Sequence, residues 1–532
     1  MGGETVDAET DVHGHHAHEP ESAPALVTMG VTQDLASPEE TEPAGGATPP
    51  EPAGGRRLPR RLPRIFTEPM WVLGLVILMD ETDKNIVRGL IPQIKADFGV
   101  GDLGIGVLLS LALLFNGIIT VPAGYLADRW NRKNAIGKTI IGWSALTAAG
   151  AASVGFPMLV GMRSLLGFGQ AVTEPSAASL IGDYYPPDER GTAFSIQQVM
   201  LLAGTGIGVG LGGLIGTTLG WRPALVIVAI PGLLVALLTF RLREPKRGTA
   251  DLMAATGGGQ IEDADEDDDA ALFDRGFWQF VKDMVSGLRA DMRTILDIRT
   301  MRYALVGVAA LLFTITAIAA WLPQYYERQL HMAAGTGEAL FTLLILLGGV
   351  PGVILGGRIA DRYAPRIEGG RLALPAIFLM AGSASVVLSY LIRADEYTLS
   401  AVVPAFLLQL VGLFIMTLAI PGLRAGLTDA IPAHLRGTGF GAFNLVSVIF
   451  GMAAAPFIVG AISGYYDDNL RVAFLLVSPF SFIGAAVLFR ARKFLDEDMQ
   501  KIMMAVLTAM QEENERKAAE AEAAGQSVET ST

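Results

Sequence analysis

Five charged residues stand close together near the start of the chain, inside a segment that is otherwise apolar. They are Asp80, Glu81, Asp83, Lys84 and Arg88. A membrane-spanning helix needs about 20 residues, so a helix that begins near residue 71 would place these charges at the middle of the bilayer. Each charge there costs roughly 2.5–3.5 kcal/mol on insertion scales. Such a cost predicts a water-filled pathway for an ion or a substrate.

The spacing of these residues places acids and bases along one face of the helix. Lys84 follows Asp80 by four residues and Glu81 by three, and Arg88 follows Lys84 by four. A carboxylate at this depth can exchange a proton, because burial favours its neutral form and a nearby cation favours its charged form. We therefore expect at least one of Asp80, Glu81 and Asp83 to bind a proton during function. The alternative is a self-neutralised cluster that only fixes helix packing.

The whole composition is that of an integral membrane protein. The 532 residues are 51% hydrophobic and 17% charged, with a mean hydropathy of +0.42. The apolar residues fall into long blocks, each long enough to cross a bilayer. The predicted spans are 70–91, 103–126, 135–154, 157–181, 193–219, 223–242, 302–325, 339–362, 371–392, 399–429, 438–464 and 471–491. The predicted fold is thus an all-α integral membrane protein, with 12 transmembrane helices in two six-helix bundles.

The boundaries of the parts follow from changes in composition. We predict a disordered polar and basic tail over 1–64, bundles over 65–242 and 301–493, an acidic linker over 243–300 and a tail over 494–532. Phe277, Phe280, Val281, Met284 and Leu288 predict an amphipathic helix in the linker, lying on the membrane surface or packed against the bundle base. Much of the net charge of −13 sits in the tails and linker, so no nucleic-acid partner is expected. The histidines near residue 15 have no fixed geometry that would predict a metal site.

Two short segments occur twice, once in each half. Gly124-Tyr-Leu-Ala-Asp128-Arg129 ends the second predicted helix, and Gly357-Arg-Ile-Ala-Asp361-Arg362 ends the eighth. A second pair, 186–194 and 432–440, opens the fifth and eleventh helices, so the two bundles are read as homologous, pseudo-symmetric halves. Arg and Lys gather in the loops at the ends of the even-numbered helices, which predicts that both termini are cytoplasmic. The repeated segment predicts a latch that holds the cytoplasmic side shut, formed by Gly124, Asp128, Arg129, Arg132, Asp361 and Arg362.

The stretch Gly124–Lys133 resembles the loop signature of the major facilitator superfamily. Further pieces resemble its spinster branch: Arg163-Ser-Leu-Leu-Gly-Phe-Gly169, Asp183-Tyr-Tyr-Pro-Pro, Gly220-Trp-Arg-Pro-Ala and Trp321-Leu-Pro-Gln-Tyr-Tyr-Glu-Arg328. The resemblance covers residues 65–492 and implies transport of lysophospholipids or sphingosine-type lipids. It also implies that Asp83 is the proton-sensitive carboxylate. The sequence departs from the branch at Lys84, where Arg is usual, and at Gln170, where Glu is usual.

Other residues are candidates for substrate binding or coupling. Arg163 in the fourth predicted helix is expected to pair with Asp83 or with a substrate headgroup, since a membrane-buried Arg needs an anionic partner. Glu174, eleven residues on, is the carboxylate of that helix and is a candidate for proton coupling in place of the Glu missing at position 170. The predicted substrate-binding residues are Lys84, Arg163, Arg424, Gln170, Trp321, Gln324 and Tyr325.

These observations predict a secondary transporter rather than an enzyme. The glycines of the fifth predicted helix lack the Lys-Ser/Thr and strand context of a nucleotide loop, so we expect no ATP, no metal and no other cofactor, with a proton gradient as the driving force. The expected substrate is an amphipathic lipid or hydrophobic drug, moved by alternating access through the plasma membrane by a monomer. The alternatives are a proton symporter of small organic anions or sugar acids, and a transport-incompetent receptor or scaffold.

Overall fold

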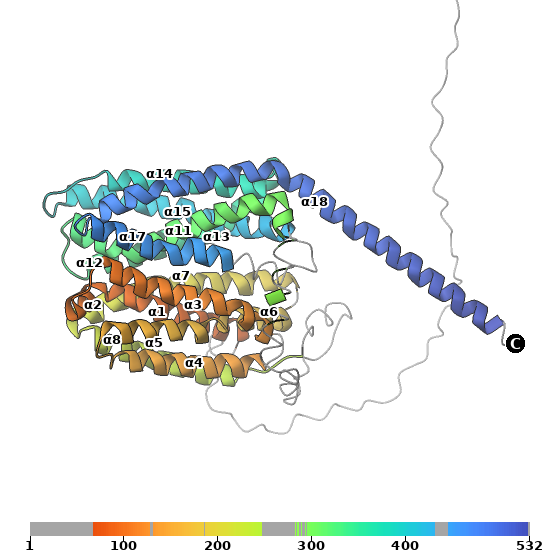
Figure 1. Ribbon diagram of the computed structural model, residues 1–532, viewed down its shortest axis with the longest axis horizontal. Helices are drawn as coiled ribbons and strands as arrows, with labels where there is room; N and C mark the ends of the chain where they lie inside the picture. Colours follow the sequence, from red (N-terminus) through yellow and green to blue (C-terminus); the bar gives the residue numbers. More distant parts are fainter. Residues whose placement is uncertain are drawn as a thin grey trace, which may run out of the picture. The chain divides into compact units, whose positions relative to one another are not determined.

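The computed structural model describes residues 68–127, 131–185, 187–246, 295–430 and 445–529, together with 282, 285, 286, 289 and 293. The predicted N-terminal tail lies outside these residues. So do the repeat segment 432–440 and, apart from isolated positions, the acidic linker with its predicted amphipathic helix. Residues 62–532 form one compact unit, and the described part of this unit is helical (Figure 1).

The described residues of the N-terminal half form eight helices, and one of the predicted spans is divided. They are α1 (Pro69–Gly89), α2 (Ile91–Phe98), α3 (Asp102–Ala127), α4 (Arg132–Gly150), α5 (Phe156–Gln170), α6 (Thr173–Tyr184), α7 (Pro187–Thr218) and α8 (Trp221–Phe240). The helix α1 coincides with the first predicted span, and the separate short helix α2 follows it, with Pro92 in its first turn, where the missing N–H of proline costs no helical hydrogen bond. The fourth predicted span divides into α5 and α6 at residues 171–172.

The C-terminal half has longer helices, two of which contain a π-helical turn. Its elements are α11 (Arg299–Gln329), α12 (Thr336–Leu344), η3 (Ile345–Gly349), α13 (Val350–Tyr363), η4 (Ala364–Arg366), α14 (Gly370–Tyr390), α15 (Leu399–Ala430), η6 (Val448–Ala453), α17 (Ala454–Tyr465) and α18 (Leu470–Glu529). The helix α18 runs without a break through the predicted boundary at residue 493, so the last span and residues 494–529 of the C-terminal tail are one helix.

Nine helical stretches within the described residues are long and apolar enough to cross a membrane. Three predicted spans, 70–91, 135–154 and 157–181, coincide with α1, α4 and the pair α5–α6, which are not among the nine. In α1 the reason is the charged cluster itself. The membrane-spanning character of the chain is therefore confirmed, and the count of twelve spans stays a prediction.

Glycines on two faces of α7 join the halves. On one face, a Cβ atom at Gly204, Gly208 or Gly212 would lie 2.4–2.5 Å from a backbone oxygen of α1. On another face, a Cβ atom at Gly210 would lie 2.5 Å from the Thr342 hydroxyl of the C-terminal half. Glycine spacing of this kind allows the close helix packing that membrane proteins use. The helix α7 thus holds α1 on one side and α12–η3 on the other.

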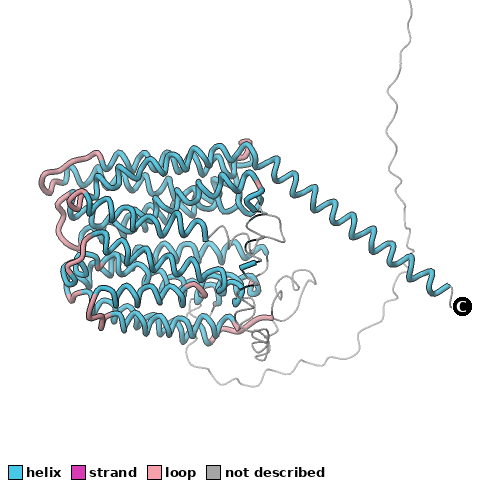
Figure 2. The backbone as a smooth tube through the Cα atoms, viewed as in Figure 1, coloured by secondary structure: helices cyan, strands magenta, loops and turns pink. Residues whose placement is uncertain are grey.

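The helices run roughly alongside one another, and the loops gather at two ends (Figure 2). We call the end that carries α2 and the loop 466–469 the α2 end. The end at which α4 begins is called the α4 end. At the α2 end the halves are in close contact, because a Cβ atom at Gly106 of α3 would lie 2.7 Å from the Pro456 carbonyl of α17.

Candidate functional site

Asp83 lies at the centre of a polar site within the N-terminal half. The residue is 4% exposed, and its two side-chain oxygens accept hydrogen bonds from Thr147 of α4 at 2.7 Å and from Gln170 of α5 at 3.2 Å. Arg163 of α5 forms an ion pair with Asp83 at 3.6 Å and also donates to its backbone carbonyl at 3.2 Å. Three helices therefore converge on one carboxylate, and the expected pairing of Arg163 with Asp83 is present in the structure.

Arg163 retains unused hydrogen-bonding capacity at this site. The side chain is buried, and its Nη2 atom has no hydrogen-bond partner among the described residues. A guanidinium group carries five N–H donors in a planar fork that matches carboxylate and phosphate groups. The site therefore has a buried donor that could meet an anionic group.

The remaining charges of α1 form a second group. Lys84 donates to Asp80 at 2.6 Å and to Glu81 at 3.0 Å, so it pairs with these two acids and not with Asp83. Glu81 also accepts hydrogen bonds from Asn85 at 3.2 Å and from Thr205 of α7 at 3.4 Å. One oxygen of Asp80, Oδ1, is buried without a partner in the described part of the chain. The predicted stripe is thus divided into a Lys84 group and an Asp83 site.

Two further candidates lie apart from the Asp83 site. Glu174 lies in the first turn of α6, the second helix of its divided span, and it is exposed. It is Gln170, not Glu174, that bonds Asp83. Arg424 of α15 is also exposed. The coupling role of Glu174 and the binding role of Arg424 stay predictions.

The aromatic candidates of α11 lie in the packed core of the C-terminal half. Trp321 is fully buried, and its indole N–H donates to the Pro456 carbonyl at 3.1 Å. Tyr325 packs edge-on against Tyr390 and Phe474. Gln324 faces the other half and donates to the Arg88 carbonyl of α1 at 3.4 Å. Of these three candidates, Gln324 is the one that reaches the N-terminal half.

The predicted latch is only partly described. Asp128 and Arg129 lie outside the described residues, and of Gly124 only the helical backbone is described. Arg132 is buried, and its guanidinium bonds Glu244 at 2.8 Å, the Pro245 carbonyl at 2.8 Å, Ser179 and Asp183.

All of these partners belong to the N-terminal half. Arg132 therefore ties α4 to α6 and to the segment after α8, rather than joining the two halves. Asp361 and Arg362 are exposed, and neither forms an ion pair within the described ranges. Of the predicted latch residues, Arg132 thus stabilises the N-terminal half and does not connect it to the other half.

An ion cluster that was not expected from the sequence joins the halves at the α2 end. Asp102, the first residue of α3, is 0% exposed. It binds Arg328 of α11 at 2.7 and 3.0 Å, Lys95 of α2 at 2.7 Å and Ser463 of α17 at 2.7 Å. Lys95 also binds Asp468 at 3.0 Å. We call these five residues the α2-end ion cluster.

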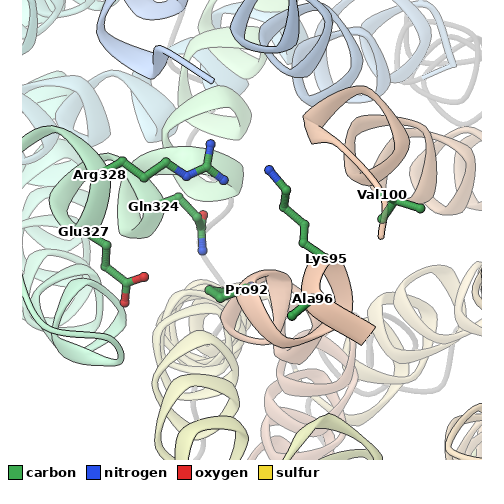
Figure 3. A pocket seen from close by; sticks show the side chains of 7 residues that line it. All are labelled: Pro92, Lys95, Ala96, Val100, Gln324, Glu327 and Arg328. Carbon is green, nitrogen blue, oxygen red and sulfur yellow. The ribbon is translucent and has the colours of Figure 1, made fainter. Parts of the chain in front are cut away.

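A small cavity adjoins this cluster. Its volume is about 370 Å³, and Figure 3 shows Lys95 and Arg328 approaching from opposite sides, with Gln324 and Glu327 on the side of α11. Pro92, Ala96 and Val100 complete the lining. The sequence shows Lys95, Asp102 and Arg328 near the ends of predicted spans. One sequence gives no sign, however, of which charges meet across the halves. Among the described residues there is no group of His, Cys, Asp and Glu that could hold a metal ion.

The geometry can be compared with known proteins. The family model described as Major Facilitator Superfamily matches residues 73–455. Spinster homolog 1 of Homo sapiens is 27% identical over 435 residues, covering 76% of this chain and 74% of the human protein. The Danio rerio protein named sphingosine-1-phosphate transporter SPNS2 is 22% identical and covers 80% and 84% of the two chains.

A solved structure shares the fold. It is that of a bacterial homolog of the human lysosomal transporter spinster in an inward-facing, unoccupied conformation. It aligns with a TM-score of 0.65 and 20% identity, covering 82% of this chain and 98% of that chain. Together with the family match over 73–455, this confirms the expected transporter fold and the assignment as a transporter rather than an enzyme. The chain is therefore a multi-pass membrane transporter that belongs to the major facilitator superfamily, in which its relatives named above are spinster proteins.

Proposed function

We propose that this protein is a proton-coupled secondary transporter of amphipathic lipids with an anionic headgroup, such as lysophospholipids or phosphorylated sphingoid bases. The observation that carries the proposal is the buried Asp83–Arg163 pair, which holds one acid and one base with a spare donor at the centre of a transporter fold. The relatives named as sphingosine-1-phosphate transporters favour a lipid of this class.

A proton and an anionic substrate would bind to different members of this pair, the proton to Asp83 and the substrate headgroup to Arg163. While Asp83 is charged, it neutralises Arg163, and the two charges stabilise each other. A proton on Asp83 removes its charge but leaves the hydrogen bonds from Thr147 and Gln170 available to a neutral carboxyl. Arg163 would then need another anion, which the substrate headgroup supplies. Proton binding and headgroup binding would in this way favour each other.

Alternating access would use the α2-end ion cluster as one gate. The cluster joins α2 and α3 to α11 and α17, so it must break when the halves separate at that end. We assign the α2 end to the non-cytoplasmic side, because the basic loops predict cytoplasmic termini. The plasma membrane and a monomeric state remain part of the proposal.

A proton symporter of small organic anions is the second candidate. The buried, unpartnered Nη2 of Arg163 favours any anion of suitable size, including a carboxylate. Thermal-shift measurements on purified protein separate the two: saturable stabilisation by lysolipids supports the first, whereas stabilisation by organic acids alone supports the second.

The coupling role of Asp83 is tested by Asp83→Asn in proteoliposomes. The amide keeps the size and hydrogen bonds of a neutral carboxyl but cannot exchange a proton, so uptake should lose its dependence on the pH gradient. The exposed Asp395→Asn serves as a control and should transport like the unchanged protein. An unaltered pH dependence in Asp83→Asn would refute the role.

A further inference from the structure

A second buried carboxylate, Glu338, lies at the contact between the two halves. It belongs to the first turn of α12 and is 1% exposed. A Cβ atom at Gly213 of α7 would lie 2.7 Å from the Cβ and Cγ atoms of Glu338. The absence of a side chain at Gly213 therefore makes the space in which Glu338 sits. This places an acid of the C-terminal half directly against the N-terminal half.

The ionisable group that faces Glu338 is another acid. One oxygen of Glu327 in α11 accepts from the backbone N–H of Gly335 at 2.7 Å, which brings its carboxylate to the first turn of α12, beside Glu338. The Oε2 atom of Glu338 has no hydrogen-bond partner in the described part of the chain. Two carboxylates this close repel each other when both are charged, so one proton between them removes the repulsion and satisfies the open oxygen.

No base within the described elements neutralises the pair. Arg328 and Lys95, the nearby bases of α11 and α2, are both bound to Asp102. The facing stretch of α7, residues 206–217, and the turn η3 contain no ionisable side chain. In α15 the ionisable residues are Arg424 and Asp429, in its last two turns. The described surroundings therefore supply no positive charge to Glu338 and Glu327, and a bound proton would supply it.

Gln324 gives an independent sign of an unfilled polar site. Its side chain is 1% exposed, and its Oε1 atom has no hydrogen-bond partner among the described residues. It lines the same cavity as Glu327, and Figure 3 shows its amide pointing toward Pro92, with Glu327 to one side. A buried acceptor without a donor is costly. A protonated carboxyl or a water molecule in the cavity would provide a donor for the Oε1 atom of Gln324.

We propose that Glu338 and Glu327 form a second proton-binding site, which takes up one proton when the halves close at the α2 end and releases it when they separate. Closure removes Glu338 from water, and a buried charge without a partner is strongly penalised. Separation would return water to the carboxylate and permit ionisation. Falling pH should therefore favour the closed α2 end, by linkage between proton binding and conformation. The proposal rests on the proposed function only in requiring that this end opens.

The test uses spin labels, because the chain contains no cysteine. Val154 and Tyr397 are exposed in loops of opposite halves. Spin labels on cysteines introduced at these two positions report the distance between the halves at the α2 end by electron–electron double resonance. All measurements are made in an Asp83→Asn background, so that the central carboxylate cannot titrate. In this background the short-distance population should grow as pH falls. With Glu338→Gln added, it should be large at every pH.

The exposed Glu368→Gln is the control and should titrate like the background protein. Equal pH responses with and without Glu338→Gln would overturn the proposal, as would a response to sodium ions that replaces the response to protons. Because Asp83→Asn is common to every arm, failure of Asp83 as the coupling residue would not alter these outcomes.

Infrared difference spectroscopy gives a second readout that does not require transport. The C=O stretching band of a neutral carboxyl should grow as pH falls, in parallel with the short-distance population, and this band should be lost in Glu338→Gln. Glu327→Gln tests the pair without altering Glu338, and it should shift the band by exchanging a carboxylate neighbour for an amide. A band that neither variant changes would refute the site.

Discussion

At the scale of single residues, the central question is how Asp83 and Arg163 tolerate burial. Each is the counter-charge of the other, so removing one leaves a buried charge without compensation, which typically costs about 3–5 kcal/mol. Arg163→Met should therefore lower the melting temperature clearly. Adding Asp83→Asn should restore most of the loss, because the second change removes the orphaned charge. Thermal unfolding of the purified variants in detergent measures both.

A surface pair of the same kind provides the comparison. Arg222 and Asp97 form an ion pair at 2.7 Å, with side chains 44% and 39% exposed. Exposed pairs contribute about 0–1 kcal/mol, so Arg222→Met should change the melting temperature little. If the double variant at Asp83 and Arg163 were as unstable as Arg163→Met alone, charge compensation would not explain the site.

At the scale of elements, the packing of α7 against α1 depends on Gly208. A Cβ atom there would lie 2.5 Å from the Thr82 carbonyl and 3.1 Å from the Asn85 Cβ. Gly208→Ala must push apart two helices, one of which carries Asp83, and overpacking of this kind costs about 1–3 kcal/mol. We expect a lower melting temperature and weaker transport. Gly142→Ala in α4, where a Cβ atom meets nothing within 4 Å, should leave both unchanged.

The elements show where a single sequence predicts structure well and where it does not. Hydrophobic blocks located the helices, because a bilayer requires apolar residues in runs of fixed length. The residue spacing also placed Lys84 beside Asp80 and Glu81, since neighbours within one helix follow from its period. The separation of Asp83 from that group depends on Thr147 and Gln170 in other helices. Trp321 and Tyr325 were chosen by residue type, and which side of α11 meets the core depends on packing that one sequence does not contain.

At the scale of the whole molecule, Asp102 joins the halves at the α2 end. It is an acceptor for Arg328 and Ser463 of the C-terminal half and for Lys95 of its own half. Asp102→Asn removes the charge that holds two bases while preserving the size of the side chain. Arg328 and Lys95 would then repel each other without a shared anion, so the closed state at this end should lose stability relative to the open state.

The spin-label pair at Val154 and Tyr397 measures this shift directly. In Asp102→Asn the long-distance population should increase at fixed pH, and a change of about 1.4 kcal/mol in the equilibrium would alter the ratio of open to closed tenfold. Asp97→Asn breaks an ion pair at the same end but within the N-terminal half, so it should leave the distances as they are. A closed population equal in Asp102→Asn and in the unchanged protein would mean that helix packing alone holds the gate, through close approaches such as that of Gly106 to Pro456. The charges would then serve the stability of the folded halves, and the gate would have to be sought in the α3–α17 and α7–α12 contacts.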